Sequence, residues 1–306
     1  MRRFSGITTT QLARICGVSQ GTVDRALHDR GGIHPKTKEK ILAVAREYEY
    51  LPRANAAGGR SMLIGVVLFD LYNEFFSKLA MSLTQRARMD GYSVIYLFSE
   101  KDMKAERAAL DYFHYIGVDG IVLFSVGSDA QDYENYLHSI RIPMVTVGNR
   151  LFDLPYVGID DTQAMYDLSS RVIERARDGE IQYFAPILKN KLHEKNAQKL
   201  RLMGFEKAMK EHARAYRIVT EDEDLSADCA GIVCSTDHYA LRVIKHLGLS
   251  PSLLLAGFDN ASSLSSIGLS LLTVEYSTDS IAEECMNCFL RRKYKTNISH
   301  CIVPNM

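Results

Sequence analysis

Short apolar runs alternate with longer stretches of helical periodicity over most of the chain beyond residue 61. The run at 62–69 contains no charged or polar side chain, which is typical of a parallel strand buried on both faces. Further strands are expected at 92–98, 120–124, 144–147, 181–184, 231–234 and 253–257, and helices at 74–90, 104–116, 132–140, 162–176, 195–211, 237–247 and 281–291. This β-α-β alternation predicts an α/β body of two doubly wound lobes.

Ligands of doubly wound sheets bind beyond the carboxyl ends of the strands. Binding residues are therefore expected in the loops after the strands, at 70–76, 125–128, 148–150, 235–237 and 259–260. The chain contains no GxxxxGK[ST], GxSxG or HExxH motif, so these loops are not expected to build a catalytic site.

The first 50 residues carry a different pattern, in which three short helical segments are separated by turns. Thr8 and Gln11 fit a capping box at the start of the first segment. Gly17 suits the turn before Ser19, which is the expected N-cap of the second segment. A third helix is expected from Pro35 to about Glu49, and the positions expected to be buried are Leu12, Ala13, Ile15, Val23, Ala26, Leu27, Ile41, Leu42, Ala45 and Tyr48.

The outer face of the second segment carries side chains that suit DNA. Gln and Arg make bidentate contacts to the edges of adenine and guanine in the major groove. The residues on this face are Gln20, Gly21, Thr22, Arg25 and His28. An all-α helix-turn-helix head is therefore expected before the α/β body.

Charge supports this division of the chain. Lys and Arg number 37, as do Asp and Glu, but residues 1–60 hold 11 basic against 5 acidic residues and the other 246 hold 26 against 32. A basic head on an acidic body favours a polyanionic partner for the head. Residues 52–60 contain no large apolar side chain and include two adjacent glycines, as expected of a linker.

Composition narrows the classes of protein to which the chain can belong. The chain has 306 residues, of which 46% are hydrophobic and 24% charged, so it is expected to fold as a globular protein of about two domains. No apolar run has the length of a membrane span and the N-terminal residues lack the apolar core of a signal peptide, so a cytoplasmic protein with reduced cysteines is expected. Cys285 and Cys288 lack two further ligands at zinc spacing, and neither a metal nor a cofactor is expected.

The segments LARICGVS at 12–19, GTVDRAL at 21–27 and YLP at 50–52 follow one another in the head. This ungapped series resembles the LacI/GalR family of repressors. The resemblance implies that the second helix lies in the major groove, with Gln20, Gly21 and Arg25 at base-reading positions and Ser19 and Thr22 at phosphates. Asp24 stands where the family usually has Ser, and Gly21 has no side chain to read a base.

The linker departs from the family pattern. Family members usually have a hinge helix whose Leu wedges into the minor groove, whereas residues 52–61 are about three residues shorter and contain no Leu. The resemblance therefore implies weaker or differently coupled DNA binding. The remaining predicted DNA contacts are Thr8, His28 and Asn55.

Five short motifs extend the resemblance through the body: NEFF at 73–76, VDGI at 118–121, RLMGF at 201–205, STD at 235–237 and GFDN at 257–260. They are similar to motifs of the family's periplasmic-binding-protein-like effector domain. The resemblance implies that aromatic rings stack on the effector while Arg and Asp bond its polar groups. The implied effector-binding residues are Asn73, Phe75, Phe76, Asn149, Arg201, Thr236, Asp259 and Tyr276.

Such a cleft suits a small polyhydroxylated ligand such as a sugar. Asn149 and Thr236 replace residues that are usual in sugar-binding members, so a nucleoside, a modified sugar or no effector stay open. The resemblance also implies that this chain lacks two parts of the family's usual effector domain. The acidic residues 220–226 are expected to be a solvated loop where the family has a strand and a helix, and the chain ends short of the usual final strand.

We therefore expect a helix-turn-helix DNA-binding domain at 1–52, a shortened hinge at 53–61 and an effector-binding and dimerisation domain at 62–306. The expected partners are double-stranded DNA, a small sugar-like effector and a second copy of the chain, which pairs through the helices at 76–88 and 281–289; no membrane is expected. Two alternatives stay open. One is a small-molecule sensor with a weakened or non-functional head, and the other is an enzyme with a fused head.

Overall fold

The computed structural model describes residues 8–27, 31–48, 60–127, 130–189, 192, 195–248, 253–266 and 271–304. The described residues divide into two compact units, one built mainly from the helical head before residue 62 and the other from most of the α/β body that begins at Met62. The predicted domain limits at 52 and 61 stay predictions, since residues 49–59 lie outside the described part. Among the helices described, none is long and apolar enough to cross a lipid bilayer.

The head consists of α1 (Thr9–Cys16), α2 (Gln20–Leu27) and α3 (Pro35–Glu47). The predicted capping box is present, because the backbone N–H of Gln11 donates to Thr8 Oγ1 over 3.2 Å and the N–H of Thr8 donates to Gln11 Oε1 over 2.7 Å. Gly17 has a φ of 68°, the left-handed conformation expected at this turn. The three helices enclose a small core of Leu12, Ala13, Cys16, Val23, Ala26, Ile41 and Ala45.

Two of the apolar residues expected in this core lie at the surface of the head. Ile15 is 43% exposed and Tyr48 is 44% exposed. Each residue of an α-helix turns by ~100°, so Ile15 falls well away from the direction shared by Leu12, Ala13 and Cys16. Tyr48 follows the last residue of α3 and is not held against the core by that helix.

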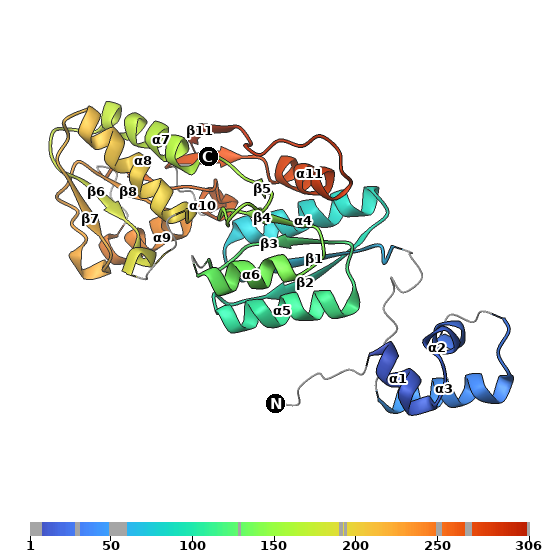
Figure 1. Ribbon diagram of the computed structural model, residues 1–306. Helices are drawn as coiled ribbons and strands as arrows, with labels where there is room; N and C mark the ends of the chain where they lie inside the picture. Colours follow the sequence, from blue (N-terminus) through green and yellow to red (C-terminus); the bar gives the residue numbers. More distant parts are fainter. Residues whose placement is uncertain are drawn as a thin grey trace. The chain divides into compact units, whose positions relative to one another are not determined.

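The first lobe of the body is a parallel five-stranded sheet in the order β2-β1-β3-β4-β5. Helices α5 and α6 cover one face of this sheet, and α4 covers the other together with α11 (Figure 1). The central strands are buried, as the continuous apolar runs predict. The elements are β1 (Leu63–Leu68), α4 (Glu74–Met89), β2 (Ser93–Phe98), α5 (Met103–Ile116), β3 (Gly120–Leu123), α6 (Gln131–Ser139), β4 (Met144–Val147), β5 (Tyr156–Val157) and α11 (Thr278–Phe289).

The second lobe is a six-stranded sheet in the order β11-β10-β9-β8-β6-β7, in which β11 alone runs antiparallel to its neighbour. Helices α7 and α8 lie side by side in Figure 1 and make close contact. The elements are α7 (Asp161–Arg175), β6 (Ile181–Phe184), α8 (Ala197–Glu211), β7 (Tyr216–Val219), β8 (Gly231–Cys234), α9 (Asp237–Leu247), β9 (Leu255–Ala256), α10 (Ser262–Ser266), β10 (Leu272–Tyr276) and β11 (His300–Pro304), with 3-10 turns at Pro186–Lys189 and Asp222–Asp224.

The second lobe contains two strands close to the places where the resemblance implied missing parts. A strand, β7, precedes the acidic segment, and the chain does form a strand at its C-terminal end, β11. Both are edge strands with exposed positions, so neither shows the continuous apolar run by which a buried strand is recognised. The acidic segment itself is mostly exposed, but it contains a 3-10 turn and buries Leu225.

Candidate functional sites

A cavity lies in the body where the carboxyl ends of strands from both sheets meet. It encloses about 670 Å³ of empty space, including its mouth. Its walls come from the segments that follow β1, β3, β4, β5, β8 and β9, from the N-terminal part of α8 and from the end of β10. This is the place where doubly wound sheets bind ligands.

All eight effector-binding residues expected from the sequence line this one cavity: Asn73, Phe75, Phe76, Asn149, Arg201, Thr236, Asp259 and Tyr276. They are separated by as much as 203 positions and come from both lobes. The structure therefore brings the whole predicted set together, although contact with an effector stays a prediction for each residue.

Aromatic rings form one wall of the cavity. The ring centroids of Phe75 and Tyr276 lie 5.5 Å apart, and those of Phe76 and Phe124 lie 5.2 Å apart with an interplanar angle of 90°. Phe76 is only 8% exposed and packs into the core. Its ring therefore supports the wall and leaves little surface for a ligand to contact. Phe75 is half-buried, and a flat ring at the surface of a cavity can stack on the apolar face of a ligand.

A buried charge network adjoins the aromatic rings through Tyr276. The guanidinium of Arg201 donates through Nε to Asp161 Oδ1 over 2.8 Å and through one terminal nitrogen to the Ser235 carbonyl over 2.8 Å. Its other terminal nitrogen lies 3.5 Å from Asp259 Oδ1. That oxygen also accepts from the Tyr276 hydroxyl over 2.8 Å. The guanidinium carbon lies 3.6 Å from the centroid of the Phe258 ring, which fixes its plane.

Burial sets the electrostatics of this network. Burial raises the pKa of Asp161 to about 6, although Arg201 acts to lower it. Burial also raises the pKa of Asp259, again against the effect of Arg201. Burial disfavours the charge of Arg201, but the two carboxylates outweigh burial and raise the pKa of the guanidinium. One permanent positive charge therefore faces two carboxylates, a set of donors and acceptors that matches neighbouring hydroxyl groups.

Asp161 lines the cavity and was not expected from the sequence. It directly follows Asp160, the N-cap of α7, and the two-residue strand β5 ends a few residues before it. Since β5 was not expected, the loop after it was not counted among the loops that follow strands. The remaining cavity residues not expected from the sequence include Phe124, Tyr156, Asn196 and Gln198.

Three of the expected polar residues already have structural partners. Asn73 is the N-cap of α4 and accepts from the N–H of Phe75 over 3.0 Å. Thr236 is the N-cap of α9 and accepts from the N–H of Tyr239 over 3.3 Å. Asn149 joins the lobes, because its amide donates to the Ser125 carbonyl over 2.7 Å and accepts from the N–H of Ala197 over 3.1 Å. These bonds hold the three side chains in fixed positions at the cavity.

A second bond between the lobes lies beside the cavity. Glu74, at the start of α4, accepts from the backbone N–H groups of Ser262 and Ser263 over 2.8 and 3.0 Å, and it pairs with Lys78 at 2.8 Å. Lys78 in turn donates to the Asn260 carbonyl over 3.0 Å. Partial burial opposes the charge of Glu74, but the bonds from Lys78, Ser262 and Ser263 lower the pKa of its carboxyl to about 2. The loop that carries Asp259 is thus tied to the first lobe.

The head presents its own candidate face on α2. Gly21 and Arg25 are exposed there. Ser19 Oγ lies 2.9 Å from Thr22 Oγ1 and accepts from the Thr22 N–H over 3.2 Å, as expected of an N-cap. The Gln20 side chain donates to the hydroxyl of Thr10 on α1, so its amide is held at the α1–α2 junction.

The remaining predicted DNA contacts are only partly described. Thr8 is exposed and caps α1. His28 and Asn55 lie outside the described residues. The structure therefore shows an exposed helix face with Arg25 on it, and contact with DNA stays a prediction for each of these residues.

Comparison with known proteins matches both units. A family profile described as periplasmic binding proteins and sugar binding domain of LacI family matches residues 61–230, and one described as bacterial regulatory proteins, lacI family, matches residues 9–53. The HTH-type transcriptional regulator DegA of Bacillus subtilis is 29% identical over 67% of this chain and 61% of its own length. The sucrose operon repressor of Pediococcus pentosaceus is 26% identical over 92% of this chain and 94% of its own.

The fold also matches solved structures. The transcriptional dual regulator Cra from Pseudomonas putida, in complex with fructose 1-phosphate, superimposes with a TM-score of 0.66 at 18% identity, over 81% of this chain and 100% of that one. At this level of identity the likeness concerns the fold.

Proposed function

The chain belongs to the LacI family of bacterial regulatory proteins, and we propose that it is a repressor that binds its operator as a homodimer and is controlled by a small sugar-like effector in the body cavity. Members of this family join a DNA-binding head to a sugar-binding domain. The division into a head at 1–52, a hinge at 53–61 and an effector domain at 62–306 is part of this proposal.

The observation that carries the effector proposal is the convergence of Arg201, Asp259 and Tyr276 with the Phe75 ring in one cavity. The charged and hydroxyl groups suit the hydroxyls of a sugar, and the flat rings suit its C–H face. The fructose 1-phosphate complex of Cra and the name of the sucrose operon repressor support a sugar for this chain. A thermal-shift screen of sugars and sugar phosphates against the full chain tests the effector class.

A second copy of the chain is needed for useful specificity, because one helix-turn-helix head makes too few base contacts. We propose that the copies pair through α4 and α11, which pack on each other at the surface of the first lobe. Met81 and Met89 on α4 are 61% and 80% exposed. Sedimentation of the purified chain tests this pairing, and a monomer at micromolar concentration would contradict it.

The test of DNA binding uses Arg25, which is exposed on α2. In electrophoretic mobility shifts with DNA upstream of the gene, Arg25→Ala should lower the preference for the operator over scrambled DNA by about 1–3 kcal/mol. Arg14→Ala removes the same charge from an exposed position on α1. This variant should weaken binding to the operator and to scrambled DNA by the same factor. Equal effects of the two variants would argue against base reading by Arg25. If the native chain bound no upstream DNA at low salt, it would instead be a sensor with a non-functional head.

A further inference from the structure

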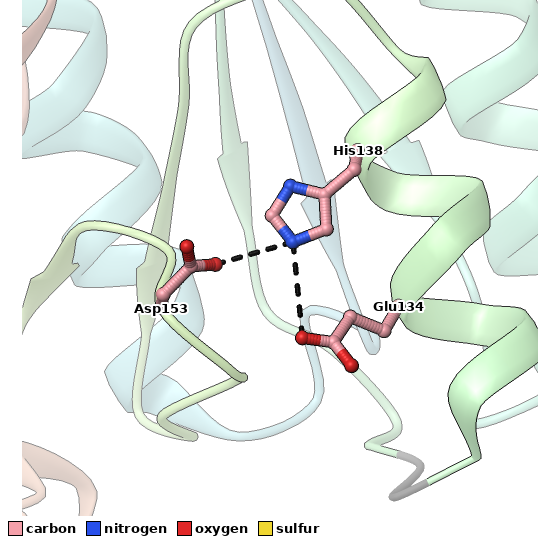
Figure 2. A group of neighbouring side chains, drawn as sticks. All are labelled: Glu134, His138 and Asp153. Atoms are coloured by element: carbon pink, nitrogen blue, oxygen red, sulfur yellow. Dashed lines mark ion pairs between the residues drawn. The ribbon is translucent and has the colours of Figure 1, made fainter.

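A histidine and two carboxylates meet on the surface of the first lobe, away from the cavity residues. Glu134 and His138 are four residues apart on α6, so their side chains share one face of the helix. Asp153 comes from the loop between β4 and β5. Figure 2 shows that Nε2 of the His138 ring is directed toward oxygens of both carboxylates. Among the described residues this is the one group of at least three such ligands found within bonding range of a single ion.

The spacing of the three ligand atoms suits a metal ion. His138 Nε2 lies 3.2 Å from Asp153 Oδ1 and 3.9 Å from Glu134 Oε1, and all three atoms lie within 4.8 Å of one another. Zinc binds imidazole nitrogen and carboxylate oxygen at ~2.0–2.2 Å, which places neighbouring ligands of a tetrahedral site about 3.3–3.6 Å apart. The observed distances lie on either side of that range, so small side-chain rotations bring the ligands around one ion.

Both elements that carry the ligands are anchored. Tyr133 and Leu137 of α6 are buried, which fixes the face that carries Glu134 and His138. Gln131 donates to Glu134 Oε2 over 2.8 Å and leaves Oε1 directed at His138. In the loop, the buried Leu151 accepts from the N–H of Leu154 over 3.1 Å. Fixed second partners of this kind orient metal ligands before the ion binds.

We propose that Glu134, His138 and Asp153 bind one zinc ion, with water completing its coordination. An imidazole together with carboxylates favours zinc over magnesium or calcium, which prefer sets of oxygen ligands. His138 and Asp153 are 45% and 78% exposed, so the ion is reached directly from solvent. The bound ion joins α6 to the loop that leads into β5, and this inference is independent of the proposed effector and operator.

Titration calorimetry of the chelator-treated full chain with zinc tests the site. We expect one ion per chain, and His138→Ala and Asp153→Asn should each weaken binding by at least ~10-fold. The matched control is His300→Ala, because His300 pairs with a single carboxylate, Asp167, at 3.0 Å; this variant should bind zinc as the native chain does. Absence of binding, or equal affinity in the native chain and His138→Ala, would overturn the proposal.

X-ray absorption of the zinc-loaded chain separates this site from the cysteines. We expect nitrogen and oxygen neighbours only, with the outer-shell pattern of one imidazole. A sulfur neighbour would assign the ion to a cysteine and contradict the proposal, since Cys288 and Cys301 are the cysteines not fully buried.

Discussion

At the scale of single residues, the cavity depends on one guanidinium. Arg201 is 6% exposed and bonds to two carboxylates, so removal of either acid leaves a buried positive charge with fewer partners. Asp161 and Asp259 differ in their second bonds, because Asp259 also accepts from Tyr276. Asp259 is therefore the acid that links Arg201 to the aromatic wall.

Asp259→Ala should abolish the response to the effector while DNA binding stays intact, because the head folds around its own core. The measurement is release of operator DNA on addition of the sugar identified by the thermal-shift screen. Glu180→Ala, which removes an exposed acid paired with Arg217, is the control and should respond like the native chain. If Asp259→Ala released DNA at the effector concentration that releases it from the native chain, the assignment of this residue would be refuted.

Asp237 is predicted to make stability depend on pH. Burial raises the pKa of Asp237 from 3.8 to about 7, although the Ala261 N–H and the Thr273 hydroxyl bond to its carboxylate. The folded state thus holds this proton more tightly than the unfolded state, so the free energy of unfolding falls as pH rises from about 4 to about 7 and is level above that. The contribution of this one group is on the order of a few kcal/mol.

Asp237→Asn should remove this contribution, and urea unfolding followed by circular dichroism at pH 4 to 7 measures it. Asp178→Asn changes a fully exposed acid that pairs with Arg214 and should keep the native slope. An unchanged slope in Asp237→Asn would show that the carboxyl of Asp237 titrates normally.

At the scale of elements, the close packing of α7 on α8 positions two cavity residues, Asp161 and Arg201. This packing needs a residue without a side chain, because a Cβ at Gly204 would lie 2.1 Å from the Thr162 carbonyl oxygen. Asp161 begins α7 and Arg201 lies one turn before Gly204 on α8, so the contact between the helices sets the 2.8 Å bond between them.

Gly204→Ala should force the two helices apart and lower the free energy of unfolding of the body by about 1–3 kcal/mol, as overpacking does. Urea unfolding followed by circular dichroism measures the loss. Met203→Ala, one position away with a side chain 55% exposed, should change stability by less than about 0.5 kcal/mol. Similar values for both variants would show that α7 and α8 tolerate a wider spacing.

At the scale of the whole body, Glu74 connects the two lobes beside the cavity. The carboxylate of Glu74 accepts from the N–H groups of Ser262 and Ser263, which lie three and four residues beyond Asp259. The lobes are therefore tied together at the edge of the site before any effector enters.

Glu74→Ala should release this tie. We expect hydrogen exchange at the amides of Ser262 and Ser263 to rise by about tenfold or more, since a charged acceptor bond contributes about 1.5–3 kcal/mol when buried and less when partly exposed. Glu174→Ala removes an exposed acid that pairs with Arg171 and serves as the control. Unchanged exchange in Glu74→Ala would show that α10 keeps its place without this carboxylate.

The sequence by itself determined the parts of this protein whose contacts are local. The caps at Thr8 and Ser19, the left-handed Gly17 and the buried strands follow from neighbouring residues and apolar runs. The family motifs contain six of the eight expected cavity residues, and the resemblance added Asn149 and Tyr276 outside them. The edge strands β7 and β11 were missed, because half-exposed strands lack that pattern.

Only the tertiary structure decided which charges meet. Arg201 bonds to Asp161 and Asp259, which lie 40 and 58 positions away, and Glu74 bonds to Ser262 across 188 positions. Asp153 likewise reaches His138 only because the loop after β4 folds back on α6. No local pattern encodes such pairs, since the packing of helices on two sheets sets the distance between residues far apart in the chain.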